Sequence, residues 1–277
     1  MVLSFATMTT TTVAVHGATG TQGSHIARRL HAAGYEIQPL DSASLDLTDI
    51  DSVTRAYAAI DAVVVQLPLV FDPVAITYAE TLLAALAKAN ITRAVFNPGM
   101  ALPPTPIGVP YVDARVALAT QLPAAVDVAS VIGPAGPYLE NFLQSWSTRR
   151  IRDRGELAYP LAAAIPVPWL ALDDLGDAIA AALGEDRPPA LAVLAGPEAA
   201  TGDQIAAAIG AGAGRTVRWV RQLLTPILGA EAAAGVAGVY EQAAAAPPPP
   251  PPPPPAEVLQ LAPTTAQQWA ARQDWTT

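Results

Sequence analysis

The sequence predicts an α/β protein built on a doubly wound parallel sheet, with a small C-terminal substrate lobe. Three observations predict it. Apolar, β-branched runs alternate with helical patterns through residues 12–132. One of these runs, DAVVVQLPL at 61–69, is almost continuously apolar, as in strands that are buried on both faces. A glycine-rich stretch, GATGTQG, separates the first run from the first helical pattern.

The elements of the first half are expected in a regular order. Strands are predicted at 12–16, 35–40, 61–69, 93–97 and 126–132, and helices at about 24–34, 51–59, 73–89 and 111–121. The first helix illustrates the basis, because Ile26, Ala27 and Leu30 recur at helical spacing and Gly34 follows them. This alternation is typical of a parallel sheet with helices on both sides.

Beyond Pro134 the pattern is looser. The segment LENFLQSWSTRRIRDRG is expected to form a helix and loop, and further helices are predicted at 173–183 and from Thr201, where Gln204 gives capping-box spacing. Strands are predicted at 190–196 and 215–220, and a helix that docks on this section is predicted in APTTAQQWAARQDW. We find few signs of a separate core. Residues 136–277 are therefore interpreted as a substrate-binding lobe, interleaved with the sheet region at 1–135.

Two segments are expected to lie outside this regular structure. Residues 1–11 precede the first predicted strand and are expected to be flexible. Residues 247–255 are nine consecutive prolines, a composition that adopts the extended polyproline II conformation. We interpret them as a semi-rigid surface loop of the lobe.

Composition limits the partners. With 24 acidic against 15 basic residues the net charge is −9, which disfavours nucleic acid. There is no cysteine, and the three histidines lack the spacing of metal ligands, so no metal site is expected. No apolar run is long enough for a membrane span, so we expect a cytoplasmic protein with a small-molecule substrate. The oligomeric state is left open, with a homodimer as one option.

Gly17, Gly20 and Gly23 form G-x-x-G-x-x-G directly between the first strand and the first helix. The first glycine permits a tight turn, the second lets the backbone approach a diphosphate, and the third lets the helix pack on the strand. The positive end of the helix then faces the diphosphate. The alternative is that the glycines serve only close packing. Dinucleotide binding predicts further contacts from Thr19, Thr21 and Gln22.

Asp41 ends the predicted second strand, where a carboxylate can accept hydrogen bonds from the ribose hydroxyls of an adenosine. No arginine is near it in the sequence, and a 2′-phosphate would meet a like charge. NAD(H) is therefore favoured over NADP(H), with a solvated loop aspartate as the alternative interpretation. Asp46 and Leu47 are expected at the next strand end, near the adenine.

Several segments together resemble the NmrA-like branch of the atypical and extended short-chain dehydrogenase/reductase superfamily, which has an NAD(P)-binding Rossmann fold. They are VAVHGATGTQGSHIARRL, ITRAVFNPG, SVIGPAGPYLENFL and PWLALDDLGDAIAAAL. The resemblance implies the fold and the class of cofactor, with cofactor contacts also from Leu67, Pro68 and Pro134. It does not fix the activity, because this branch includes reductases, redox-sensing regulators and proteins with other chemistry.

The resemblance also implies catalytic positions. Tyr111 matches the family's tyrosine proton donor, and Arg115 stands where the family has a lysine that holds the nicotinamide ribose and lowers the tyrosine pKa. Arginine can tune the phenol electrostatically, but it stays protonated and cannot relay a proton. Asn97 stands in the position of the carbonyl-binding serine, and Thr105 is a second candidate for that role. Tyr138 and Asn141 match positions that border the substrate.

These residues lead to one functional prediction and two alternatives. We expect an NAD(P)-dependent oxidoreductase that reduces a carbonyl, imine or enone of a small, largely apolar substrate. The first alternative is a non-catalytic NmrA-like redox sensor that binds NAD(P). The second is a redox-neutral cyclase or isomerase on the same fold.

Overall fold

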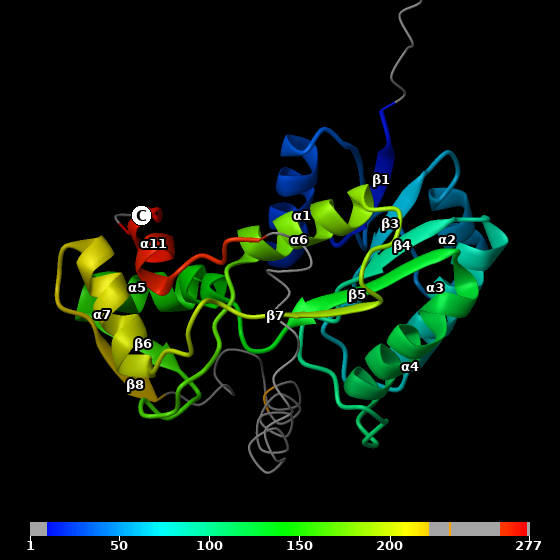
Figure 1. Ribbon diagram of the computed structural model, residues 1–277. Helices are drawn as coiled ribbons and strands as arrows, with labels where there is room; N and C mark the ends of the chain where they lie inside the picture. Colours follow the sequence, from blue (N-terminus) through cyan, green and yellow to red (C-terminus); the bar gives the residue numbers. More distant parts are fainter. Residues whose placement is uncertain (1–9, 222–232, 234–260, 276–277) are drawn as a thin grey trace, which may run out of the picture.

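The protein is described by a computed structural model for residues 10–221, 233 and 261–275 (Figure 1). The expectations for residues 1–9 and for the prolines at 247–255 lie outside these described residues. The strands of the main sheet are β1 (Thr12–His16), β2 (Glu36–Leu40), β3 (Ala62–Val65), β4 (Arg93–Phe96), β5 (Val128–Pro134) and β7 (Leu191–Leu194). All pair in parallel, in the order β2-β1-β3-β4-β5-β7. The predicted doubly wound parallel sheet is confirmed.

Helices cover both faces of the sheet. On one face lie α1 (Thr21–Ala32) and α6 (Leu172–Gly184), and on the other lie α2 (Ile50–Ala56), α3 (Val74–Lys88) and α4 (Pro110–Ala125) (Figure 1). Alternate strand residues feed the two cores. Val64 packs with α1 and α6, whereas Val63 and Val65 pack toward α3 and α4. Strand β3 is apolar throughout because both of its faces are buried.

The sheet reverses its strand order next to β1, and this places the opening of the fold. The chain runs outward from β1 to β2, then crosses back to β3 on the other side of β1. In sheets of this kind ligands bind in the crevice at the carboxyl ends of the strands beside such a reversal. The predicted strand at 61–69 in fact ends at Val65. Residues from Gln66 onward leave the sheet, and Pro68 has no N–H to donate to a neighbouring strand.

The lobe is built from segments after β5 and differs from expectation in having its own core. Its elements are η1 (Leu139–Leu143), α5 (Ser145–Arg154), β6 (Glu156–Tyr159), α7 (Gly202–Ala213), β8 (Arg218–Arg221) and α11 (Ala266–Ala271). Phe142 is fully buried at the centre, with its ring 5.0 Å from Trp169 and 6.5 Å from Trp269, measured between centroids. Strand β6, which the sequence analysis missed, pairs with β8 in a separate two-stranded sheet.

Two buried carboxylates fasten the C-terminal segment to the rest of the molecule. Asp174 accepts hydrogen bonds from the N–H and the hydroxyl of Thr264, at 2.7 and 2.6 Å. Glu140 accepts one from the Trp269 indole at 2.9 Å and one from the Leu172 N–H at 3.0 Å. Burial raises the pKa of both carboxyls. The predicted docking of the tail helix is confirmed, including its Thr cap.

Ion pairs join α1 to α6 across the surface of the sheet layer. The Arg29 guanidinium donates to both oxygens of Asp177, at 2.5 and 2.7 Å. Asp173 receives the Arg28 guanidinium at 2.5 Å and the His25 ring at 2.7 Å. Helix α1 is thereby held against α6. In the part of the chain that the structure describes, no helix combines the length and apolar character needed to cross a bilayer.

Candidate cofactor and active site

A cleft of about 1100 Å³ opens at the carboxyl ends of β1 to β4, at the strand reversal. It has two ends, which we name for their residues. The glycine end contains the GATGTQG turn and the loop after β2, and the tyrosine end contains Asn97, Tyr111 and Arg115. Most of the predicted cofactor residues line it, namely Gly17, Thr19, Gly20, Thr21, Gln22, Gly23, Asp41, Asp46, Leu47, Leu67, Pro68 and Arg115.

The glycine turn has the shape that a diphosphate requires. Gly17 adopts a left-handed backbone with φ of +63°, and its N–H donates to the Leu40 carbonyl at 2.7 Å. A Cβ on Gly23 would lie 2.0 Å from the Gly17 carbonyl oxygen, so no side chain fits there. The cap of α1 is Gly20, which offers no side chain to the open N–H groups of the first turn. Those N–H groups are left to hold an anion from the cleft.

The two aspartates of the loop after β2 are partly engaged in their own turns. One Asp41 oxygen accepts from the N–H groups of Ala43 and Ser44, both at 3.1 Å. Its other oxygen makes no hydrogen bond within the described residues. Asp46 accepts from the N–H and hydroxyl of Thr48, and these bonds lower its pKa. The glycine end therefore carries negative charge, and among the residues that line the cleft the only arginine or lysine is Arg115.

His16 lies under the cleft at the end of β1. Its side chain is buried, and its Nε2 lies 2.8 Å from the Tyr57 hydroxyl. Burial lowers its pKa from the usual 6.5 to about 4, so the ring is neutral at neutral pH. The His16 carbonyl accepts a hydrogen bond from the Gln66 amide at 2.6 Å. The sequence predicts that His16 is not a metal ligand, but it does not indicate either contact.

Asn97 is in the predicted place, but its side-chain amide is fully used by the protein. The Nδ2 donates to the Gln22 and Gln66 oxygens at 2.9 and 3.0 Å. The Oδ1 accepts from the Gly99 N–H at 2.9 Å and from the Tyr138 hydroxyl at 3.2 Å. An amide has two N–H donors and two lone pairs on its oxygen, and all four are occupied. As the side chain stands, it has no free donor for a substrate carbonyl.

Arg115 is buried and is bound to backbone carbonyls. Its guanidinium donates to Pro98 at 2.9 Å, to the Tyr111 carbonyl at 2.9 Å, and to Leu67 and Pro68 at 2.8 and 3.1 Å. Within the described residues no carboxylate lies at ion-pair distance, and burial lowers its pKa. Four of its five N–H donors are thus spent. This geometry does not favour the expected role of Arg115 as a ribose clamp.

Tyr111 is held by its ring, and its hydroxyl is open. The Arg115 guanidinium carbon lies 3.7 Å from the ring centroid, which is cation–π geometry. The ring also stacks with Phe71, with centroids 4.7 Å apart at 28°. The Tyr111 hydroxyl makes no hydrogen bond within the described residues. A phenol whose ring is fixed in this way and whose hydroxyl is open has the arrangement of a proton donor.

Four predicted site residues do not line the cleft. Pro134 pairs with Leu194 inside the sheet. Thr105 is exposed on the loop before α4. Tyr138 is buried, with its hydroxyl on Asn97, and burial raises its pKa. Asn141 donates to the Tyr159 hydroxyl at 3.2 Å, within the lobe.

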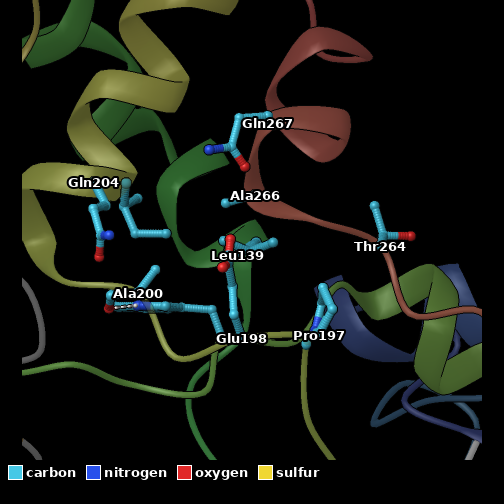
Figure 2. Close-up of a pocket in the computed structure, with 11 residues that line it drawn as sticks. Leu139, Pro197, Glu198, Ala200, Gln204, Thr264, Ala266 and Gln267 are labelled. Atoms are coloured by element: carbon cyan, nitrogen blue, oxygen red, sulfur yellow. Dashed lines mark hydrogen bonds between the residues drawn. The ribbon is translucent and has the colours of Figure 1, made fainter.

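A second, much smaller cavity lies in the lobe between α7, the loop at 196–200 and the start of α11 (Figure 2). Leu139, Gln204 and Gln267 are among the side chains around it. Its volume of about 30 Å³ is room for a few water molecules at most. The large cleft is therefore the better candidate for a cofactor and substrate site.

The chain is similar to a known family and to a curated protein. Residues 13–97 match the model of the NAD dependent epimerase/dehydratase family. A curated NAD(P)H azoreductase from Xenophilus azovorans is 28% identical over 225 residues, which cover 75% of this chain and 76% of that protein.

Solved structures resemble the chain over almost all of its length. Triphenylmethane reductase of Citrobacter sp., complexed with NADP(H), has a TM-score of 0.70 at 16% identity and covers 94% of this chain and 99% of its own. The Escherichia coli NADPH-dependent quinone oxidoreductase, complexed with NADPH, has a TM-score of 0.61 at 17% identity, covering 94% and 98%. At these identities the likeness concerns the fold.

Proposed function

We propose that this chain, which has a Rossmann fold and resembles the NmrA-like, atypical short-chain dehydrogenase/reductase type, is an NAD(P)H-dependent reductase. The observation that carries the proposal is one continuous cleft that joins the glycine turn to the open Tyr111 hydroxyl. The nucleotide would lie with its diphosphate on the N-terminus of α1 and its nicotinamide toward Tyr111. Bound NAD(P)H would supply a hydride to the substrate.

The residues of the tyrosine end suggest how the chain would complete the reduction. In a C=O or C=N acceptor, the hydride would reach the carbon and Tyr111 would give its hydroxyl proton to the oxygen or nitrogen. In an azo acceptor, one nitrogen would take the hydride and the other would take the proton. The Arg115 cation, fixed over the ring, would stabilise the phenolate until water returns the proton. Arg115 thus acts through the ring of Tyr111. One hydride and one proton are consumed for each acceptor reduced.

The substrate we propose is an apolar, conjugated acceptor, of the enone, quinone, imine or azo type. The cleft beside Tyr111 is lined by apolar side chains, among them Leu67, Leu69 and Val70. Leu69 is 52% exposed, an unusual position for a large apolar side chain and a suitable one for a contact with such a ligand. The azoreductase, whose name states reduction of an azo bond with NAD(P)H, supports this class.

For the cofactor we propose NAD(H) in preference to NADP(H). The free oxygen of Asp41 is available to the ribose hydroxyls, and Asp46 adds to the negative charge of the same loop. The lining of the glycine end provides no cation to compensate a 2′-phosphate. A 2′-phosphate would therefore be repelled at this end of the cleft.

The first test is nucleotide binding followed by turnover. The purified protein is titrated with NADH and NADPH by fluorescence, and oxidation of the bound form is followed at 340 nm with a naphthoquinone, an azo dye, an imine and an aldehyde. We expect binding of NADH and oxidation with at least one conjugated acceptor. Absence of binding of either nucleotide would contradict the proposal.

The closed amide of Asn97 favours one alternative, a regulator that binds NAD(P) without turnover. In that case the tyrosine end would be a remnant, and the cleft would keep only its affinity for the nucleotide. Tight nucleotide binding with no oxidation in the presence of any acceptor in the panel would support this alternative over the reductase.

A further inference from the structure

Three side-chain amides form a row across the cleft, and we call it the amide row. Gln66 follows β3, Asn97 follows β4, and Gln22 lies in the first turn of α1. The Gln66 Nε2 donates to the His16 carbonyl, its oxygen accepts from Asn97, and Asn97 donates again to the oxygen of Gln22. Each amide therefore fixes the orientation of the next.

Backbone groups at the row determine its direction. The His16 carbonyl can only accept a hydrogen bond, so Gln66 must turn its NH₂ toward it. The Gly99 N–H can only donate, so Asn97 must turn its oxygen toward Gly99 and its NH₂ toward the two glutamines. The oxygen of Gln22 is then the group that faces Asn97. Its NH₂ is left at the free end of the row.

The NH₂ of Gln22 is an oriented donor without a partner. Gln22 lines the cleft and is half-buried, and within the described residues its Nε2 makes no hydrogen bond. Gly99 is packed against it, because a Cβ there would lie 3.3 Å from the Gln22 oxygen. Residues 97–99 also connect Gln22 to the tyrosine end, because the Arg115 guanidinium donates to the Pro98 carbonyl and lies over the Tyr111 ring.

The geometry points to Gln22 as the hydrogen-bond donor to a carbonyl oxygen at the tyrosine end, in the role that the sequence assigned to Asn97. This inference rests on the proposed function. The carbonyl oxygen belongs either to the acceptor or to the carboxamide of the nicotinamide. Asn97 is the positioning residue that turns the Gln22 NH₂ outward.

The test uses two substitutions and a remote control in the full chain. Gln22→Glu keeps the oxygen that accepts from Asn97 and replaces the NH₂ by an oxygen, and Gln22→Met removes both. Gln121→Glu makes the same chemical change on the exposed surface of α4. For each protein we would measure the melting temperature, the Kd of NADH, the Kd of ADP-ribose, which lacks the nicotinamide, and the KM and kcat for 1,4-naphthoquinone.

Two results support the inference and identify the oxygen. A rise in the Kd of NADH by about ten-fold, with ADP-ribose unchanged, assigns the donor to the carboxamide. Unchanged nucleotide Kd values with kcat/KM for the naphthoquinone about ten-fold lower assign it to the acceptor. If all constants stay at wild-type values, or if NADH and ADP-ribose weaken equally, the inference is overturned. Failure of the wild type itself to bind NADH would instead overturn the proposed function.

A third variant tests the direction of the row. Asn97→Asp replaces the NH₂ that both glutamines contact by an oxygen, so Gln22 would turn its own NH₂ inward and its oxygen toward the cleft. A folded Asn97→Asp protein should then reproduce the pattern of constants of Gln22→Glu although Gln22 is intact. A folded protein with wild-type constants would show that the row does not orient Gln22.

Discussion

The two ends of the cleft differ in how far the protein satisfies its own polar groups. At the glycine end the first N–H groups of α1 have no cap side chain, and one Asp41 oxygen accepts no hydrogen bond from the described part of the chain. At the tyrosine end Asn97 makes four hydrogen bonds and Arg115 makes four, all within the protein. One end is open for a ligand, and the other is rigid and leaves the Tyr111 hydroxyl open. The Gln22 amide comes from the glycine turn and is held by Asn97 where the two ends meet. Rigidity of this kind is what a reaction site needs to hold its donors in place.

We expect the largest effect from a substitution in the glycine end. Gly23→Ala places a Cβ 2.0 Å from the Gly17 carbonyl oxygen, so the turn that would hold the diphosphate must shift. We expect roughly a 100-fold loss in nucleotide affinity, which is about 2.7 kcal/mol of binding free energy. Titration with NADH measures it. Gly184→Ala is the matched control, because its Cβ would meet only the Tyr35 hydroxyl at 3.6 Å. Equal affinities in both variants would show that the turn does not carry the nucleotide.

A second prediction concerns His16, which is buried at the end of β1 and borders the cleft. Its folded pKa of about 4 is below the usual 6.5, so the unfolded chain binds the proton first. The stabilisation is complete above pH 6.5 and is lost as the pH falls to about 4, by about 3 kcal/mol. Denaturant unfolding of wild type and His16→Gln measures this, and the difference between them should change over that interval. Parallel pH profiles would contradict the assignment.

A third prediction separates the effect of Tyr111 on turnover from its effect on stability at the tyrosine end. Tyr111→Phe keeps the ring between Phe71 and Arg115 and removes a hydroxyl that makes no hydrogen bond to the residues described by the structure. Turnover should fall by about 100-fold, the usual loss for a general acid, while the free energy of unfolding stays within about 0.5 kcal/mol. Steady-state kinetics and urea unfolding measure the two. Tyr35→Phe, remote from the cleft, is the control, and unchanged turnover in Tyr111→Phe would eliminate the acid.

The smallest effect refines the charge of the glycine end. Asp41→Asn keeps an oxygen for the Ala43 and Ser44 N–H groups but removes the negative charge. We expect the ratio of the NADPH and NADH dissociation constants to shift toward NADPH by about ten-fold. The same change at the exposed Asp127 provides the control. A ratio that does not move would assign Asp41 to its turn alone.

The same contrast explains what the sequence could and could not predict. The glycine end depends on local geometry, so Gly17, Gly20 and Gly23 were sufficient to predict it, and the alternation of strands and helices was sufficient for the sheet. The tyrosine end was predicted by position only. The Asn97 amide has no free donor because of its hydrogen bonds with Gln22, Gln66 and Tyr138. These three residues come from other segments, and no spacing along the chain indicates that they meet at Asn97.

The separate core of the lobe was missed for a related reason. Its aromatic rings, Phe142, Tyr159, Trp169, Trp219 and Trp269, are far apart in the sequence and none belongs to a periodic run. Strand β6 has only four residues, too few for a recognisable alternation. Long-range packing of single residues is the information that a local pattern does not contain.

The hydrogen bonds from Thr264 to Asp174 and from Trp269 to Glu140 have a consequence for the order in which the protein folds. During synthesis Phe142, Glu140 and Asp174 leave the ribosome well before residue 264 exists. Until then Phe142 lacks its contact with Trp269, Glu140 accepts only from the Leu172 N–H, and Asp174 lacks its hydrogen bonds from Thr264. The sheet region has all of its strands by residue 194 and can fold in that interval. In the newly made chain the sheet region would then be folded before the lobe is complete. We expect the lobe to become resistant to proteases only when α11 has been synthesised and has docked.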